Sequence, residues 1–122
     1  MTQNGTLGEQ FAADYLKQQG YQIVETNFHT RFGEIDIIAK KGDILAFIEV
    51  KTRAASMLAT PAEAVTPAKQ KKLIKATLQY IQTHPSELQP RFDVVSIITK
   101  TKSDFAVLEI MHLTDAFEAS SQ

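Results

Sequence analysis

The chain has 122 residues, no cysteine, and 13 Lys and Arg against 14 Asp and Glu. This length predicts a single domain over 1–122 that buries roughly two-thirds of its surface. The lack of cysteine excludes disulfides, a thiol nucleophile and Cys-based metal sites, and it is compatible with the reducing cytoplasm, where we expect the protein. Balanced charge argues against wholesale polyanion binding, and no apolar run approaches the roughly 18–20 residues that a membrane span needs.

A capping box opens the first predicted helix, because Thr6 suits the N-cap and Glu9 follows three residues later. The helix is predicted to end near Gln19, where Gly20 suits the C-terminal cap, and a first strand is expected over 21–28. Glu9 has two readings. It is either a capping residue or an acidic group that leans over the sheet toward other carboxylates.

Two alternating apolar segments, 33–39 and 44–51, follow in the sequence. A two-residue turn at 42–43 predicts that they form a β-hairpin. Since residues two apart in a strand share a face, Ile35 and Ile37 are expected on the face opposite the acidic residues.

Acidic residues crowd the other face of this predicted hairpin. The turn makes paired positions add up to 85, which places Asp36 opposite Glu49 and Glu34 opposite Lys51. Like charges directly opposed destabilise a sheet, so the cluster needs a compensating cation. A divalent metal ion is one candidate and Lys51 is the other, in which case the cluster is only a set of salt bridges.

A second helix is predicted to start at Thr66 and Pro67, as N-cap and first helical residue, and to end near His84. A loop is expected before it, over 54–65. The predicted buried face of the helix consists of Leu73, Ile74, Thr77, Leu78, Tyr80 and Ile81.

Lys71, Lys72 and Lys75 occupy the opposite arc of this helix, with Lys69 at the border. They form either an ordinary solvated surface or a patch that follows phosphates, since lysines supply sequence-independent nucleic-acid affinity. Gln70 falls on the apolar side near the helix start, where a polar group needs a partner. It either bonds free backbone groups there or reaches the carboxylates.

Strands are predicted over 91–99 and 105–110, and the helix before the first of them suits a parallel crossover. The chain after Leu113 is expected to form a short helical turn and to be disordered from Ala119. The sequence therefore predicts an α/β fold. Its mixed central sheet has about five strands and two main flanking helices, in the order α-β-β-β-α-β-β.

Asp36 followed by Glu49 and Lys51 is the arrangement that a metal-dependent phosphodiesterase needs. Asp36 and Glu49 would hold Mg²⁺ or Mn²⁺, with the carbonyl of Val50 as a further oxygen ligand. The cation would polarise the phosphate and activate a water, which Lys51 would position, or Lys51 would stabilise the transition-state charge. The candidate nucleic-acid contacts are Arg31, Arg53, Lys69, Gln70 and Lys72.

This pattern resembles the PD-(D/E)xK nuclease superfamily, and a wider set of residues resembles the bacterial YraN family, which is predicted to be nuclease-like. The resembling positions are Gly5-Thr6-Leu7-Gly8-Glu9, Ala12, Tyr15-Leu16, Gly20-Tyr21, Asn27, Gly33-Glu34-Ile35-Asp36-Ile37-Ile38-Ala39, Phe47-Ile48-Glu49-Val50-Lys51-Thr52-Arg53, Ala64-Val65, Lys69 and Arg91-Phe92-Asp93-Val94. The resemblance covers nearly the whole chain. It implies a restriction-endonuclease-like core, DNA as partner and Mg²⁺ or Mn²⁺ as cofactor.

The superfamily includes archaeal Holliday-junction resolvases, which place a helix Glu, a strand Asp and an ExK motif in the same order. By that similarity Glu9, Asp36, Glu49 and Lys51 are the active-site set, and a homodimer is implied. Ile35 stands where the superfamily has Pro.

Three functions follow from these observations. The first is a divalent-metal-dependent endonuclease that hydrolyses DNA, with branched DNA as the implied substrate. The second is a nucleic-acid-binding module that keeps the fold without catalysis. The third is an accessory subunit of a DNA-processing complex.

Overall fold

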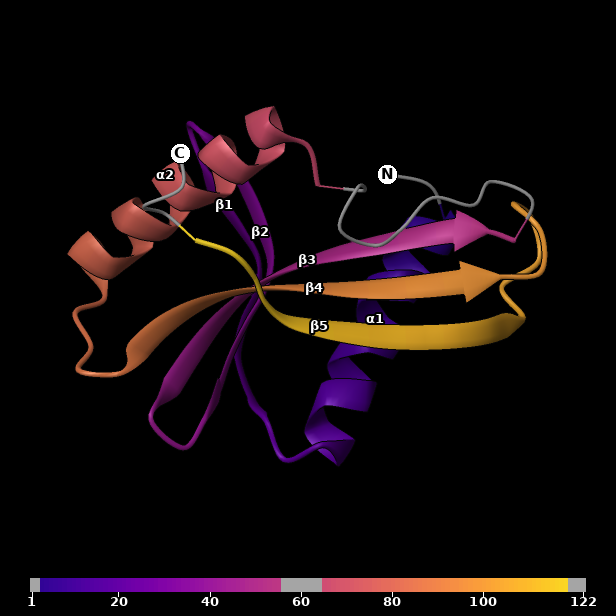
Figure 1. The fold of residues 1–122 in the computed structure, drawn as a ribbon, viewed down its shortest axis with the longest axis horizontal. Coiled ribbons are helices and arrows are strands. Elements are labelled where there is room, and N and C mark those ends of the chain that lie inside the picture. Colours follow the sequence, from indigo (N-terminus) through magenta and orange to yellow (C-terminus); the bar gives the residue numbers. More distant parts are fainter. Residues whose placement is uncertain (1–2, 56–64, 119–122) are drawn as a thin grey trace.

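The computed structural model describes residues 3–55 and 65–118, which form two helices and one five-stranded sheet (Figure 1). The elements are α1 (Gln3–Gln18), β1 (Gln22–Thr30), β2 (Gly33–Lys41), β3 (Ile44–Ala54), α2 (Pro67–Thr83), β4 (Gln89–Thr99) and β5 (Val107–Phe117). The strands lie in the order β1-β2-β3-β4-β5; β3 and β4 pair in parallel and the other neighbours are antiparallel. The α/β fold, strand number and element order expected of a restriction-endonuclease-like core are confirmed.

The sheet separates two apolar cores, and one helix covers each face (Figure 1). The buried residues of the core beneath α1 are Ala12, Leu16, Ile37, Ala39, Ala46, Ile48, Val95 and Ile97. Those of the core beneath α2 are Ile35, Ile38, Leu45, Phe47, Leu73, Ala76, Tyr80 and Phe92. Of the helices in the described part of the chain, none is long and apolar enough to cross a membrane.

Local sequence signals place the helix end and the turn as predicted. Gly20 has a φ of +94°, and the N–H of Tyr21 donates to the carbonyl of Leu16 at 2.9 Å, which closes α1 in a Schellman motif. Gly42 has a φ of +59° in the β2–β3 turn, where the left-handed conformation suits glycine. Thr66 caps α2 by accepting a hydrogen bond from the N–H of Lys69 at 3.2 Å.

The predicted capping box is wrong. The first helix begins at Gln3, so Thr6 lies inside it and Glu9 is not in the first turn. The helix also makes a tertiary contact that the local pattern does not contain. Gly8 lies so close to β3 that a Cβ at this position would collide with the hydroxyl of Thr52.

The prediction of a helical turn after Leu113 is also wrong, because β5 continues to Phe117. Phe117 pairs with Phe92 of β4, and their rings stack with centroids 5.0 Å apart. Leu78, expected to be buried, is 56 % exposed, since the stripe of α2 that faces the sheet runs through Leu73, Ala76 and Tyr80. Most of the predicted 54–65 loop and the predicted disordered tail lie outside the described residues.

Candidate active site

The predicted hairpin register is confirmed over five residue pairs between β2 and β3, ending at Ile37 and Ile48. Beyond this point Oδ2 of Asp36 accepts a hydrogen bond from the backbone N–H of Val50 at 2.8 Å. Meanwhile β3 keeps its parallel pairing with β4 as far as Ala54. The regular β2–β3 ladder therefore ends at Asp36, whose side chain binds the neighbouring strand directly.

The alternation of faces along β2 also breaks at Asp36. Ile35 belongs to the core beneath α2 and Ile37 to the core beneath α1, so the prediction that they share a face is wrong. On β1, Asn27 lies beside this point with a φ of 53°, a conformation that strand residues other than glycine rarely adopt. This irregularity of two neighbouring strands is why a period-two pattern failed here.

Glu34 lies opposite His29 of β1, and not opposite the β3 residue that the register predicted, because β2–β3 pairing has already ended. Its carboxylate meets those of Glu9 and Asp36 instead. One oxygen from each of the three lies within 4.8 Å of the other two. Together with Glu49 these residues form what we call the carboxylate cluster.

Asn27 joins two members of the carboxylate cluster. With the amide oriented so that both its ends are satisfied, its nitrogen donates to Glu9 Oε1 at 2.7 Å and to Glu34 Oε1 at 2.5 Å. Burial raises the pKa of Glu9, and the charge of Glu34 raises it further, while the bond from Asn27 lowers it in part. Of the two readings of Glu9, the structure therefore supports the one in which it faces other carboxylates.

Asp36 is the most strongly perturbed of these groups. Burial, and next the negative charge of Glu49, raise the pKa of Asp36 to about 8. The N–H of Val50 favours the charged form but does not outweigh them. Without a cation, the surroundings of Asp36 therefore favour the protonated form of its carboxyl group.

Two lysines face Glu49 at the edge of the cluster. Nζ of Lys51 and Nζ of Lys69 each lie 3.7 Å from Oε1 of Glu49. Partial burial and the nearby ammonium of Lys69 lower the pKa of Lys51, and the charges of Glu49 and Asp36 offset this only in part. Lys69 reaches this position because Thr66 and Pro67 start α2 one turn before it.

The other predicted contacts divide between the cluster and its surroundings. Nε2 of Gln70 donates to the carbonyl of Val65 at 3.0 Å. This bond agrees with the expectation that Gln70 binds backbone groups at the start of the helix. Arg53 lies on β3, four residues beyond Glu49. The N–H of Val50 binds Asp36, while a ligand role for its carbonyl stays a prediction.

Arg31 and Lys72 lie by the β1–β2 turn. The guanidinium of Arg31 is over the ring of Phe32, and Lys72 packs against Gly33. The sequence did not predict Glu34 as a metal ligand or Asn27 as a hydrogen-bond donor to the cluster. An Asn inside a predicted strand was the available signal for the latter, since Asn is depleted in strands and tolerates the left-handed region.

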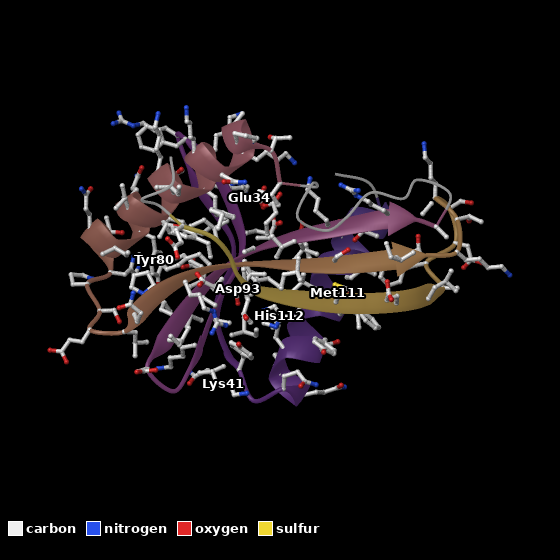
Figure 2. All side chains as sticks on the ribbon, viewed as in Figure 1. Glu34, Lys41, Tyr80, Asp93, Met111 and His112 are labelled. Atoms are coloured by element: carbon white, nitrogen blue, oxygen red, sulfur yellow. The ribbon has the colours of Figure 1, made fainter. Side chains whose placement is uncertain are left out.

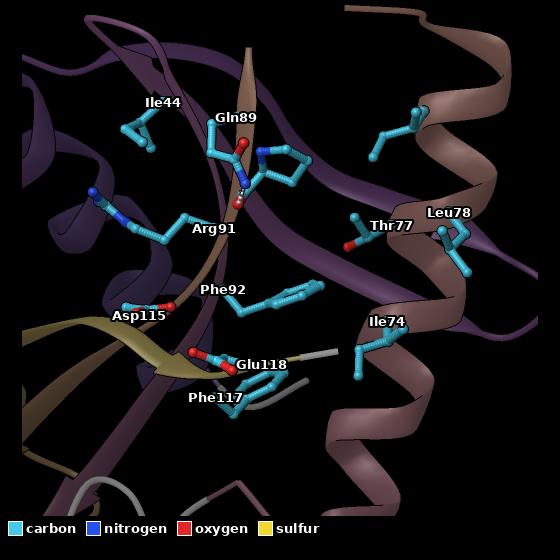
Figure 3. Close-up of a pocket in the computed structure, with 12 residues that line it drawn as sticks. Ile44, Ile74, Thr77, Leu78, Gln89, Arg91, Phe92, Asp115, Phe117 and Glu118 are labelled. Atoms are coloured by element: carbon cyan, nitrogen blue, oxygen red, sulfur yellow. Dashed lines mark hydrogen bonds between the residues drawn. The ribbon is translucent and has the colours of Figure 1, made fainter. Parts of the chain in front are cut away.

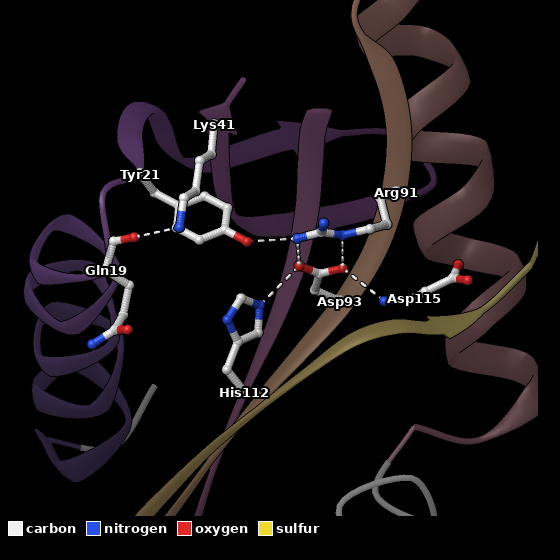
Figure 4. A network of polar contacts seen from close by, with 7 residues as sticks. All are labelled: Gln19, Tyr21, Lys41, Arg91, Asp93, His112 and Asp115. Atoms are coloured by element: carbon white, nitrogen blue, oxygen red, sulfur yellow. Dashed lines mark hydrogen bonds and ion pairs between the residues drawn. The ribbon is translucent and has the colours of Figure 1, made fainter. Parts of the chain in front are cut away.

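A second cluster of polar residues, which we call the Asp93 network, lies beneath α1 (Figure 4). Asp93 is fully buried and binds Arg91 through two bonds of 2.8 Å, His112 Nε2 at 2.8 Å and the N–H of Asp115 at 3.0 Å. Arg91 also donates to the hydroxyl of Tyr21 at 2.7 Å. Figure 2 shows Glu34 on one side of the β4 ribbon and His112 on the other, so the carboxylate cluster and the Asp93 network are separate.

A cavity of about 690 Å³ lies between α2, the start of β4 and the end of β5 (Figure 3). Its lining is mainly apolar and contains none of the predicted site residues. The hydroxyl of Thr77, which lines it, is buried without a hydrogen-bond partner in the described structure. Cavity size therefore does not mark the candidate active site here.

Comparison with known proteins gives one family. The model of "Uncharacterised protein family UPF0102" matches residues 8–97. A UPF0102 protein of Syntrophus aciditrophicus is 46% identical over 122 residues, covering 97% of this chain and 93% of that relative. One from Chlorobium phaeobacteroides (strain DSM 266) is 45% identical over 94% of this chain and 93% of that relative, and one from Syntrophomonas wolfei is 43% identical over 93% and 96%. The family suggested by the sequence motifs is confirmed, and the chain belongs to the uncharacterised protein family UPF0102.

Proposed function

We propose that the carboxylate cluster binds a divalent cation and that the protein is a metal-dependent endonuclease acting on DNA, with branched DNA as substrate. The observation that carries this proposal is the convergence of Glu9, Glu34 and Asp36, from α1 and β2, with ligand oxygens within 4.8 Å of one another. Carboxylates from different elements rarely crowd together in a partly buried place without a function, because their mutual repulsion is costly.

The residues present fit Mg²⁺ or Mn²⁺. Both ions prefer hard oxygen ligands, and the cluster offers carboxylate oxygens only. The raised pKa of Asp36 arises from burial and like charge, and a bound cation would relieve both. When bound, the cation would polarise a phosphate and lower the pKa of a water molecule.

The surrounding residues supply the complementary chemistry. Lys51 is a partly buried ammonium beside Glu49, where it would orient a water or stabilise negative charge on the phosphate. Lys69, Lys72 and Arg31 present positive charge on the same side, which suits a phosphodiester backbone. A DNA substrate would agree with the cytoplasmic location expected from the sequence.

Cleavage tests this function directly. Purified protein is incubated with branched, single-stranded and duplex DNA in Mg²⁺ and in Mn²⁺, next to Asp36→Ala and the exposed matched control Asp14→Ala. We expect metal-dependent cleavage that falls at least about 100-fold in Asp36→Ala and is unchanged in Asp14→Ala. Activity that survives in Asp36→Ala would come from a contaminant or another site.

Binding assays separate the two alternatives. Salt-sensitive DNA binding without cleavage would identify a non-catalytic binding module, whereas no DNA affinity would identify an accessory subunit. Mn²⁺ binding, followed by electron paramagnetic resonance, should be lost in Asp36→Ala. The resemblance to resolvases also implies a homodimer, which sedimentation of the full chain would detect as a doubled mass.

A further inference from the structure

The β1–β2 turn and α2 line an open cavity of about 580 Å³ outside the carboxylate cluster. Phe32 is at the tip of the turn, and two cations lie near its ring. The guanidinium of Arg31 is 4.9 Å from its ring centroid, and Nζ of Lys75 is 5.7 Å from it. The lining residues are Arg31, Phe32, Lys75, Leu78, Gln79, Gln82 and Thr83, none of them acidic.

A row of lysines connects this cavity with the carboxylate cluster. Lys69, Lys72 and Lys75 follow one another at intervals of three residues on α2, which spans about 9 Å at 1.5 Å per residue. Lys69 contacts Glu49, and Lys75 is over the ring of Phe32. The Cβ of Lys72 lies 3.6 Å from the point that a Cβ on Gly33 would occupy. Positive charge therefore continues from the cluster to the turn.

We propose that this cavity binds an unpaired nucleotide of the DNA whose backbone is cut at the carboxylate cluster. A base in a duplex is stacked on both sides and offers no free face to an aromatic ring, whereas an unpaired base does. Phe32 provides the stacking surface, and the amides of Gln79 and Gln82 provide donors and acceptors for the base edge. Arg31 and Lys75 bind the flanking phosphates.

The size and charge of the cavity agree with this ligand. Its volume lies within the roughly 300–1,000 Å³ range of small-ligand sites. The inference rests on the proposed nuclease function and makes it more specific. The preferred substrate is a duplex that carries a single-stranded end or flap.

The test is DNA binding, measured by fluorescence anisotropy in Ca²⁺, with the DNA checked for intactness afterwards. One labelled duplex is blunt and the other carries a single-stranded overhang. We expect Phe32→Ala to weaken binding of the overhang DNA about tenfold, or about 1.4 kcal/mol, and binding of the blunt duplex less than twofold. Lys100→Ala, which removes an exposed lysine of the β4–β5 turn, is the matched control and should change neither.

A second variant and a second measurement distinguish a specific loss of binding from misfolding of Phe32→Ala. Gln82→Ala changes only an exposed residue of α2 and should also weaken the overhang DNA selectively. Photocrosslinking of an iodouracil in the overhang should label the peptide that contains Phe32. Equal losses on both DNAs, no loss on either, or a crosslink elsewhere would overturn the proposal. These outcomes do not depend on cleavage, so they are distinct from a failure of the Asp36→Ala experiment.

Discussion

Two aspartates in the middle of the sheet have opposite environments. Asp93 is fully buried, and Arg91, His112 and the N–H of Asp115 all donate to its carboxylate. Burial alone would raise the pKa of Asp93, but these hydrogen bonds outweigh it and hold the pKa below the ordinary value. Asp36 accepts one backbone N–H, but burial and the negative charge of Glu49 outweigh this bond and raise its pKa to about 8.

The different surroundings of the two aspartates distinguish a structural network from a candidate functional site. The charge of Asp93 is fully compensated by the protein itself, and nothing further is required for stability. The ionised form of Asp36 has no such compensation for burial and the charge of Glu49, so an external cation would stabilise it. Burial of an ionisable group is thus a poor guide to function, whereas the balance of its neighbours is informative.

The largest effect is expected at Asp93. Asp93→Ala leaves Arg91 and His112 without their partner in a buried place, so the free energy of unfolding should fall by about 3–5 kcal/mol. Urea denaturation measures this fall, and the exposed Asp14→Ala should change stability by less than about 0.5 kcal/mol. A loss below about 1 kcal/mol would mean that the Asp93 network is not a structural centre.

A smaller effect of opposite sign is expected at Asp36 in metal-free buffer. Its pKa is about 8 in the folded state against an ordinary 3.8, so the stability it contributes is fully present below pH 3.8 and is lost as pH rises toward 8. Asp36→Asn should therefore be more stable than the native chain by roughly 1–3 kcal/mol at pH 8.5 and by little at pH 4.

Thermal unfolding in EDTA across this pH range checks the prediction for Asp36. Mn²⁺ should stabilise the native chain at pH 8.5 more than it stabilises Asp36→Asn, because the variant replaces one charged ligand of the cluster with a neutral amide. A stability difference that is independent of pH would remove the contrast between the two aspartates.

The smallest effect is expected at the rim of the Asp93 network. Tyr21→Phe removes the hydroxyl that accepts from Arg91 at 2.7 Å, while Arg91 keeps both bonds to Asp93. The expected loss in the free energy of unfolding is about 0.5–1.5 kcal/mol. Tyr15→Phe on α1 is the control for loss of a hydroxyl, and equal losses in the two variants would argue against a network role for Tyr21.

Much of the fold could be predicted because its signals are local. The glycine at the end of α1, the tight turn after β2 and the Thr66–Pro67 start of α2 are each fixed by a few adjacent residues. The extension of β5 to Phe117 could not be predicted, because it depends on pairing with Phe92, 25 residues earlier in the chain. Strand formation there is decided by long-range contacts.

The sequence alone determined which residues meet at the candidate site in outline, because the hairpin register brings Asp36 near Glu49 and the motif adds Glu9 and Lys51. Only the tertiary structure decided how they meet. The left-handed Asn27 and the end of the β2–β3 ladder bring Glu34 to Glu9 and Asp36, and α2 places Lys69 on Glu49. A strand pattern encodes regular alternation, and the site is built where two neighbouring strands depart from it.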